Sequence, residues 1–403
     1  MPCKIYLRHD QSILQRQRFS SEKVTIFAPS WVQSALNFLG ERLNGTKFEL
    51  FENGKSSNPL ESFTITKDFN NQSLTILQRI ARNESHNVSG VINTTLYPDI
   101  ADRGILYSIR DIVRQCVIVG VDQCSFYGGY RCNRNSQPKQ RVYVCDLAAL
   151  QFQQAYNSGR LVLIQEGEQH SGVLDDLVYE KVVGEKKRSF SEVQQSWGEH
   201  DNESDKLKKR YIRHDGYGLP GRGSCFFDTK AYASFVKHDV ILYGLALQKM
   251  VSVHHPKDKI HFKFLKYGTG FFAWKFAQIL DELILPAVLD GLEELLGKPE
   301  MSAIKKIELP FYECRPCDAK RLENFQSKFA IEVIFSANDA LKQSFSKEGL
   351  IVSTTNCGDS HAVCGNEMQF GSVDAAVAEN LESKGNIFCP NINLSITEQY
   401  ISF

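Results

Sequence analysis

The chain has 403 residues, of which 42% are hydrophobic and 23% charged, so it can bury a large core and has the composition of a globular protein. Lys plus Arg and Asp plus Glu number 47 each, which excludes a protein whose overall charge attracts nucleic acid or an anionic membrane. The N-terminal residues lack the apolar stretch of a secretory signal, and no apolar run approaches the roughly 18 residues of a membrane span. We therefore expect a soluble, cytoplasmic protein that binds neither nucleic acid nor membrane.

Eleven cysteines are scattered along the chain, an odd number at irregular spacings. This is not the framework of a small disulfide-bonded domain, and we expect reduced thiols. Cys314 and Cys317 form a CxxC pair, but no second pair lies at zinc-binding spacing, and His254 and His255 are an isolated pair. The sequence therefore predicts no metal site and no bound cofactor.

The first part of the chain alternates strand and helix patterns. Residues 23–28 predict a strand and residues 30–43 a helix. An amphipathic helix at 101–115 then leads into the apolar run 116–121, which is typical of a strand buried on both faces, as in a parallel sheet. We interpret residues 1–110 as an N-terminal α/β elaboration without a recognisable site.

The alternation continues through the remainder of the chain, residues 111–403, which we take as one domain. Strand patterns at 142–147 and 161–166 favour a doubly wound α/β sheet. Residues of about 180–211 are polar and charged and offer little to bury, so we expect an exposed excursion or insertion there.

Two glycine-rich segments farther along the chain each lead into a helix. The first is residues 213–236. The second is GTGFF, which follows a strand that begins at Lys259. It leads into a long amphipathic helix that we expect to be interrupted at Pro286. Strands at 303–312 and 329–337 come next, so we expect βαβ crossovers.

Residues 350–381 combine a short apolar strand, a polar loop with three glycines, and a helix pattern that begins near Val373. Such a turn brings backbone N–H groups and the positive end of a helix to one point, which suits a phosphate or pyrophosphate. Three acids lie in the same segment: Asp359, Glu367 and Asp374. A site that only holds phosphate has little use for carboxylates, whereas one that hydrolyses a neighbouring bond does.

Residues 266–273, KYGTGFFA, form another strand-to-helix turn that can present several N–H groups to a diphosphate. Together with TTN at 354–356 and FGSVDAAV at 370–377, this turn resembles the two ligand loops of macrodomains. The two loops stand here in reversed order, so the resemblance implies a circularly permuted or rearranged macrodomain. It is similar to a type found among bacterial effectors and, more distantly, to poly(ADP-ribose) glycohydrolases. The fold implied over roughly 210–385 is a three-layer, macrodomain-like mixed sheet flanked by helices.

The resemblance further implies ADP-ribose as ligand or product and an ADP-ribosylated protein, such as modified ubiquitin, as partner. Asp374 would be catalytic beside the distal ribose, and Asp359 or Glu367 would aid departure of the leaving group through an oxocarbenium-like state. Asn356 would contact that ribose. The remaining ligand contacts would come from Gly268, Thr269, Gly270, Phe271, Phe272, Gly371 and Ser372.

The motifs also depart from the family pattern. The glycine triplet of ordinary macrodomains is reduced to Gly371 and Ser372, and the Gln-Glu-Glu of the glycohydrolases is absent. These differences leave open which acid is catalytic. The likeness to effectors raises secretion into a host cell alongside the cytoplasmic expectation.

The same acids have structural interpretations. Asp374 complements a helix dipole, Asp359 suits a turn, Glu367 suits a solvated loop, and Asn356 suits a turn cap. A non-catalytic ADP-ribose reader is therefore the first alternative to a hydrolase.

Cys225 supports a second alternative, a cysteine-dependent hydrolase or transferase. It lies near an expected helix N-terminus, which would lower its pKa, and His214 or His361 would serve as base. A buried structural thiol is the competing interpretation. The basic run 206–213 is typical of a solvated face.

Overall fold

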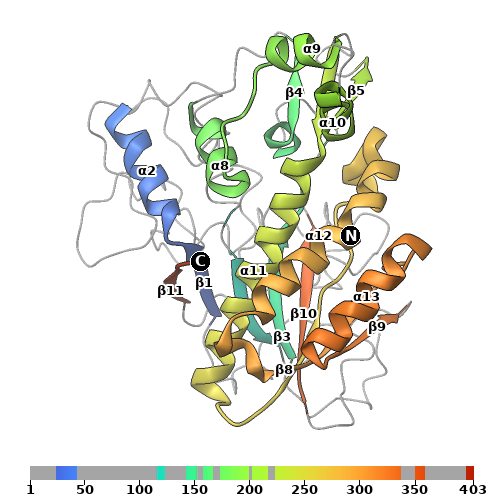
Figure 1. Cartoon of the computed structure of the whole chain (residues 1–403). Coiled ribbons are helices and arrows are strands. Elements are labelled where there is room, and N and C mark those ends of the chain that lie inside the picture. The colour runs from blue at the N-terminus through green and yellow to red at the C-terminus, as the bar shows by residue number, and fades with distance from the viewer. Residues whose placement is uncertain are drawn as a thin grey trace, which may run out of the picture.

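The computed structural model shows a mixed α/β protein with a large central sheet, helices packed against it, and a small second sheet at one end (Figure 1). Among its described helices, none combines the length and apolar character required to cross a bilayer. The residues it describes are 24–42, 115, 117–122, 142–150, 152, 158–166, 173–198, 202–216, 223–336, 350–358 and 396–403.

The central sheet has eight strands in the order β11-β1-β2-β3-β10-β7-β8-β9. In chain order they are β1 (Val24–Pro29), β2 (Val117–Asp122), β3 (Val142–Ala148), β7 (Ile260–Lys263), β8 (Ile304–Pro310), β9 (Glu332–Ser336), β10 (Ile351–Gly358) and β11 (Ile396–Ile401).

Within the run β3-β10-β7-β8-β9 of this sheet, each strand is parallel to the next. β2, in contrast, runs antiparallel to both β1 and β3. The run 116–121 thus forms a strand as predicted, but the expectation that it lies in a parallel part of the sheet is wrong. An apolar run demands burial, and burial is available between antiparallel neighbours as well.

The predicted crossovers are confirmed. α12 (Ala277–Leu296) connects β7 to β8, and α13 (Pro316–Phe329) connects β8 to β9. Pro286 lies inside α12, so the expected interruption there does not occur. Proline removes the hydrogen bond to the carbonyl of Glu282, and that residue is exposed, where water can replace the lost donor.

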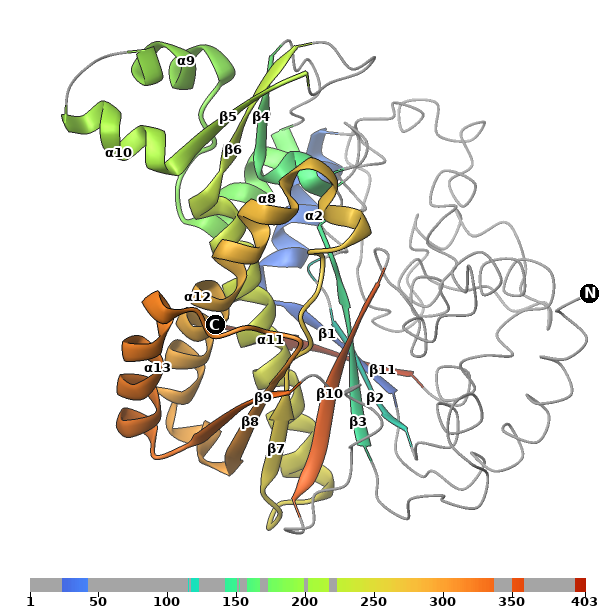
Figure 2. The same cartoon turned by 90° about the vertical axis from the view of Figure 1, so that its right-hand side faces the viewer.

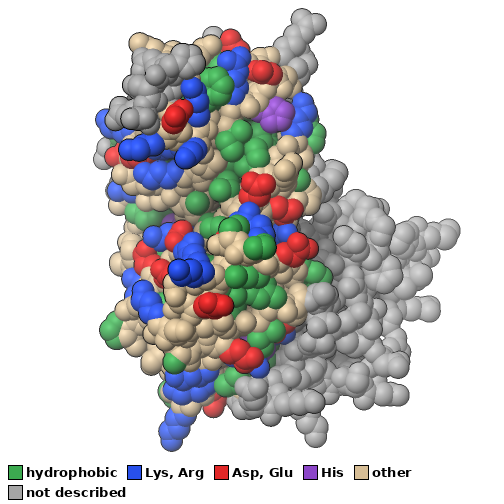
Figure 3. Space-filling view, turned by 45° about the vertical axis from the view of Figure 1, so that its right-hand side comes forward, with side chains coloured by type: hydrophobic (Ala, Val, Ile, Leu, Met, Phe, Trp, Pro, Cys, Tyr) green, Lys and Arg blue, Asp and Glu red, His purple; other side chains and the backbone are tan. Residues whose placement is uncertain are grey.

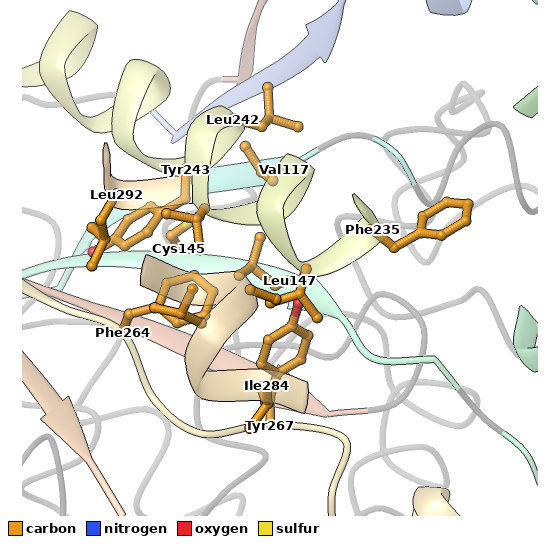
Figure 4. Packing of buried hydrophobic residues seen from close by; sticks show 14 of the residues in the cluster. Val117, Cys145, Leu147, Phe235, Leu242, Tyr243, Phe264, Tyr267, Ile284 and Leu292 are labelled. Carbon is orange, nitrogen blue, oxygen red and sulfur yellow. The ribbon is translucent and has the colours of Figure 1, made fainter. Parts of the chain in front are cut away.

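The main core lies between the sheet and the paired helices α11 (Thr229–His254) and α12, which Figure 2 shows with α13 on one side of the sheet. Figure 4 shows Cys145 and Leu147 of β3 packed near Tyr243 of α11. The two helices approach closely at Gly291, where an added Cβ would lie 2.8 Å from the Cβ of Val240. Glycine at this position permits the close crossing.

The second sheet has three antiparallel strands in the order β4-β6-β5. They are β4 (Leu163–Gln165), β5 (Tyr211–Asp215) and β6 (Ser224–Asp228). The strand predicted at 161–166 therefore begins later and belongs to this sheet and not to the central one.

The charged segment 180–211 is more ordered than its composition suggests. It contains α9 (Phe190–Gly198) and α10 (Asn202–Arg210), which pack on the small sheet. A few apolar residues at helical spacing suffice to anchor these helices. Their core consists of Ile164, Val193, Tyr211 and Phe226, with Phe190, Trp197 and Leu207 packed against it.

A buried polar network joins the small sheet to α11. Asp228, the fully buried last residue of β6, caps α11 by accepting a hydrogen bond from the Ala231 backbone N–H. It also accepts hydrogen bonds from the Arg210 guanidinium, at 2.9 and 3.1 Å, and from the Tyr179 hydroxyl at 2.5 Å. Burial, together with Asp228, raises the pKa of Tyr179, so its hydroxyl stays a donor. Arg210 also pairs with Glu185.

The remaining described elements are two α-helices and three short 3-10 helices. They are α2 (Trp31–Arg42), α8 (Val173–Val183), and the 3-10 helices η3 (Ser158–Leu161), η4 (Phe271–Phe276) and η5 (Pro299–Ala303).

Candidate functional site

Two of the predicted ligand segments follow neighbouring strands. β7 and β10 are adjacent and parallel, so the segments that leave their carboxyl ends start from the same edge of the sheet. A side-chain contact reinforces this edge, because the hydroxyl of Thr355 in β10 accepts a hydrogen bond from the backbone N–H of Leu265 at 2.8 Å. In open α/β sheets the carboxyl edge is where ligands bind.

The glycine turn after β7 contacts the segment that follows β3. Gly268 has φ +68°, a conformation that favours glycine, and an added Cβ would lie 3.5 Å from the Cβ of Ala149. The carbonyl of Phe272 accepts a hydrogen bond from the backbone N–H of Phe152 at 2.9 Å. β10 lies between β3 and β7 in the sheet, so these contacts join the turn to the strand beyond its immediate neighbour.

The surface of this turn is open. Gly270 is exposed and an added Cβ would meet nothing within 4 Å, and Thr269 is half-exposed. Phe272, one of the two aromatic residues predicted to contact a ribose, is half-buried and packs against the main core. Phe271 is the first residue of η4. The turn thus presents backbone to solvent at its tip and is anchored by Phe272.

Trp274 in η4 is strained and exposed. Its backbone has φ 48° and ψ −118°, although tryptophan is not favoured at positive φ, and 43% of the side chain is accessible to solvent. Such conformations cost about 1–3 kcal/mol and cluster at functional sites. The ammonium of the next residue, Lys275, lies 4.6 Å from the indole ring centroid and donates a hydrogen bond to the Gly216 carbonyl at 3.2 Å.

The second predicted loop lies largely outside the described residues. Asn356 belongs to β10, where its Cα pairs with that of Asp146 in β3. The predicted catalytic acids and the remaining ligand residues of this loop fall in the part of the chain that the structure does not describe: Asp359, Glu367, Gly371, Ser372 and Asp374.

A small pocket, with room for about one water molecule, adjoins the glycine turn. Aromatic side chains dominate its walls. Burial raises the pKa of Tyr232, with Asp281 and Asp239 adding to the shift, so this hydroxyl remains protonated. The lining residues are Leu150, Tyr232, Phe235, Val236, Asp239, Tyr267 and Gly268.

Asp239 is the polar centre of this pocket. It is 5% exposed, and its Oδ2 accepts a hydrogen bond from the Tyr267 hydroxyl at 2.6 Å. Its Oδ1 has no hydrogen bond to any described residue, and Nδ1 of His238 lies 3.9 Å away. An available carboxyl oxygen beside the glycine turn suits a ligand group that donates an N–H. The sequence analysis missed Asp239, although an acid within the otherwise apolar stretch of α11 was a visible signal.

A second polar cluster lies at the carboxyl ends of β7, β8 and β9. Lys263 is fully buried, and its ammonium lies 3.1 Å from Oε2 of Glu308. His261 Nε2 is 3.1 Å from the same oxygen, at an angle that is poor for a hydrogen bond, and the Ser336 hydroxyl donates to Oε1 at 2.7 Å. Phe262 and Phe264 alternate with His261 and Lys263 and face the main core, so this cluster lies on the opposite face of the sheet.

The charge of Glu308 is well stabilised. Burial alone would raise its pKa, but His261, Ser336 and the Lys263 charge outweigh burial and lower the pKa to about 2. The carboxyl is therefore ionised throughout the physiological range, and its environment is fixed by these three side chains.

The cysteine alternative is not favoured by its surroundings. Cys225 lies within β6, three residues before the cap of α11, and is fully buried, which fits a structural thiol. His214 is its register partner on β5. Cys314 and Cys317, in contrast, are exposed, and no group of three or more potential metal ligands occurs among the residues described.

The basic run 206–213 is only partly a solvated face. Lys and Arg side chains, interspersed with Asp and Glu, are visible at the small-sheet end of the molecule in Figure 3. Lys206 and Lys209 are exposed, but Arg210 belongs to the buried network around Asp228. The guanidinium of Arg213 lies 5.9 Å from the ring centroid of Trp197.

Comparison with known proteins places the chain in no group. No protein-family model matches the sequence, and no curated protein matches it significantly.

Proposed function

We propose that this chain is a rearranged, macrodomain-like protein that binds ADP-ribose and hydrolyses an ADP-ribosyl linkage on a modified protein. The proposal depends on one observation: the open glycine turn after β7 is held to β10 and to the segment after β3, directly beside a pocket that contains Asp239. The acid-rich segment 359–374 follows β10 in the sequence. The adenine, the diphosphate and the distal ribose of ADP-ribose would thus each contact a segment that starts from the same edge of the sheet.

Each part of the ligand has a matching chemistry. Exposed backbone at Thr269 and Gly270 would donate N–H groups to the diphosphate. The adenine would lie at the mouth of the small pocket, with its amino group donating a hydrogen bond to Oδ1 of Asp239. Asp374 would stabilise the positive charge that develops at the distal ribose, while Asp359 or Glu367 would assist the leaving group.

Calorimetric titration with ADP-ribose tests the binding step. Asp239→Asn keeps the shape of the pocket but replaces one acceptor oxygen by a donor, and we expect at least a tenfold loss of affinity, about 1.4 kcal/mol. Glu300→Gln is the matched control, because Glu300 is an exposed acid in η5, before the amino end of β8. Absence of binding by the unmodified chain would overturn the proposal.

A turnover assay separates the enzyme from a reader. Release of ADP-ribose from ADP-ribosylated proteins, with modified ubiquitin among them, is followed for the unmodified chain and for Asp374→Ala. An enzyme releases ADP-ribose, and the variant still binds it but releases none. If the unmodified chain binds ADP-ribose and releases none from any substrate, the protein is a reader.

A further inference from the structure

The CxxC pair occupies a position with redox chemistry of its own. The chain leaves the carboxyl end of β8 at Pro310, passes through Cys314, and enters α13 at Pro316, with Cys317 in the first turn. A CxxC sequence placed between a strand and the helix of a βαβ unit is the arrangement expected of a redox-active dithiol. We propose that Cys314 and Cys317 form a reversible disulfide by exchange with a low-molecular-weight disulfide such as oxidised glutathione.

Accessibility distinguishes this pair from the other cysteines of the described residues. Cys314 and Cys317 are both exposed, whereas Cys145 and Cys225 are buried. Exchange requires direct attack by a thiolate on a disulfide sulfur, so a buried thiol is excluded until the protein opens. The pair is therefore the site, among the residues described, that a small disulfide can reach in the folded protein.

The local backbone allows the ring to close. A disulfide requires Cβ atoms about 3.8 Å apart, and residues three apart at a helix end have Cβ atoms about 5–6 Å apart. Cys317 is held in the first turn of α13, whereas Cys314 precedes the cap residue Arg315 and is not constrained by helical geometry. Its Sγ already lies 3.8 Å from the Arg315 carbonyl oxygen, on the side of the helix start. Closure of the ring therefore requires Cys314, which lies outside the helix, to move toward Cys317.

The surroundings indicate which sulfur attacks first. Burial raises the pKa of Cys314, and the nearby charges of Asp318 and Cys317 add to the shift. Cys317, in contrast, is held in the first turn of α13. The two residues therefore have unequal roles, with Cys317 as the nucleophile and Cys314 as the resolving thiol.

The reaction balances in two exchanges. The Cys317 thiolate attacks one sulfur of the small disulfide, forms a mixed disulfide, and releases the first small thiolate. Cys314 then gives its proton to solvent and attacks the Cys317 sulfur, which breaks the mixed bond and releases the second small thiolate. The dithiol is oxidised by two electrons, and the small disulfide is reduced to two thiols.

Peptide mapping of the full chain tests the proposal directly. The protein is incubated with oxidised glutathione, quenched with acid, alkylated and digested with trypsin. Both cysteines fall in the peptide Ile307–Lys320, because the bond between Arg315 and Pro316 resists cleavage. We expect this peptide to resist alkylation and to be lighter by two hydrogen atoms than the reduced form. If it is fully alkylated at both cysteines, or joined to another peptide, the proposal is overturned.

Two serine variants test the order of attack. In Cys314→Ser the mixed disulfide with glutathione should accumulate on Cys317, since no resolving thiol is present. In Cys317→Ser, modification of Cys314 should be about tenfold slower, because its thiolate is scarcer. Circular dichroism confirms that both variants are folded, as expected for exposed positions. Equal rates would overturn the assigned roles, and protection that is relieved only by a zinc chelator would overturn the dithiol itself.

Discussion

Glu308→Gln should be strongly destabilising, although it replaces only one side-chain oxygen by an amide nitrogen. The substitution removes the negative charge that compensates Lys263, whose ammonium is fully buried 3.1 Å away. The amide oxygen of the new side chain can still accept the hydrogen bond from Ser336, so packing and one polar contact are preserved. What is lost is charge compensation.

The magnitude follows from the pKa of Glu308. A decrease from the ordinary 4.5 to about 2 means that the folded protein favours the ionised carboxyl by about 3 kcal/mol. Leaving a buried cation without its partner typically costs about 3–5 kcal/mol. Both arguments agree, and we expect Glu308→Gln to lower the free energy of unfolding by about 3–5 kcal/mol at pH 7.

Urea unfolding monitored by tryptophan fluorescence measures this change, and a double-mutant cycle isolates its cause. Lys263→Met removes the cation and keeps the apolar stem of the side chain. In the double variant with Glu308→Gln no buried charge is left unpaired, so we expect it to be more stable than Glu308→Gln alone, with a coupling energy of about 1–3 kcal/mol. If Glu308→Gln alone does not fold, a folded double variant with Lys263→Met would show the same coupling between the two residues.

Two results would refute this reasoning. A loss below about 1 kcal/mol in Glu308→Gln would mean that the pair is hydrated and behaves as a surface ion pair. Strict additivity of the two substitutions would mean that Lys263 is compensated by another group. Ser336 provides the matched control, because Ser336→Ala removes a neutral donor to the same carboxylate and should cost only about 1 kcal/mol.

Three further predictions concern the same molecule. The folded pKa of Glu308 lies below the unfolded value, so its stabilisation is complete above about pH 4.5 and is lost as the pH falls toward 2; acid unfolding curves should be flatter in this range for Glu308→Gln. Gly291→Ala forces a Cβ to within 2.8 Å of Val240 and should lower the free energy of unfolding by about 1–3 kcal/mol in urea titration. Tyr179→Phe deprives buried Asp228 of one donor and should lower the thermal midpoint, at a cost of about 1–3 kcal/mol in calorimetry.

The sequence predicts the elements of this fold better than their partners. The apolar runs at β1, β3 and β8 and the crossover helices were identified because period and composition are local properties. The predicted direction of β2 was wrong, and the strand near residue 163 was assigned to the wrong sheet. Strand pairing depends on residues that are distant in the sequence, so a single apolar run does not reveal it. Residues 180–211 were expected to be exposed, and most of the described ones are exposed or only partly buried. The two helices in this segment were not predicted, because the apolar residues that anchor them are few.

In the candidate site too, the residues that belong to a local sequence pattern were predicted, and those that depend on distant partners were not. Gly268 and its neighbours were identified from a local turn signature, and the structure confirms a strand-to-helix turn at the carboxyl edge. Asp239 was missed because its importance arises from Tyr267, which is distant in sequence and adjacent in space. The alternation of His261 and Lys263 is typical of a strand with one polar face, but it cannot reveal that this face is buried against Glu308.

The placement of the Lys263–Glu308 pair has a consequence for the edge that carries the glycine turn. A buried ion pair usually contributes less stability than apolar side chains of the same volume, so its value lies in fixing one arrangement. Here it joins the last residue of β7 to β8 in a single register, and Thr355 holds the next segment, Leu265, to β10. Gly268 follows three residues later. The turn therefore starts from a point that is fixed on both sides by directional contacts, which apolar packing alone would not supply.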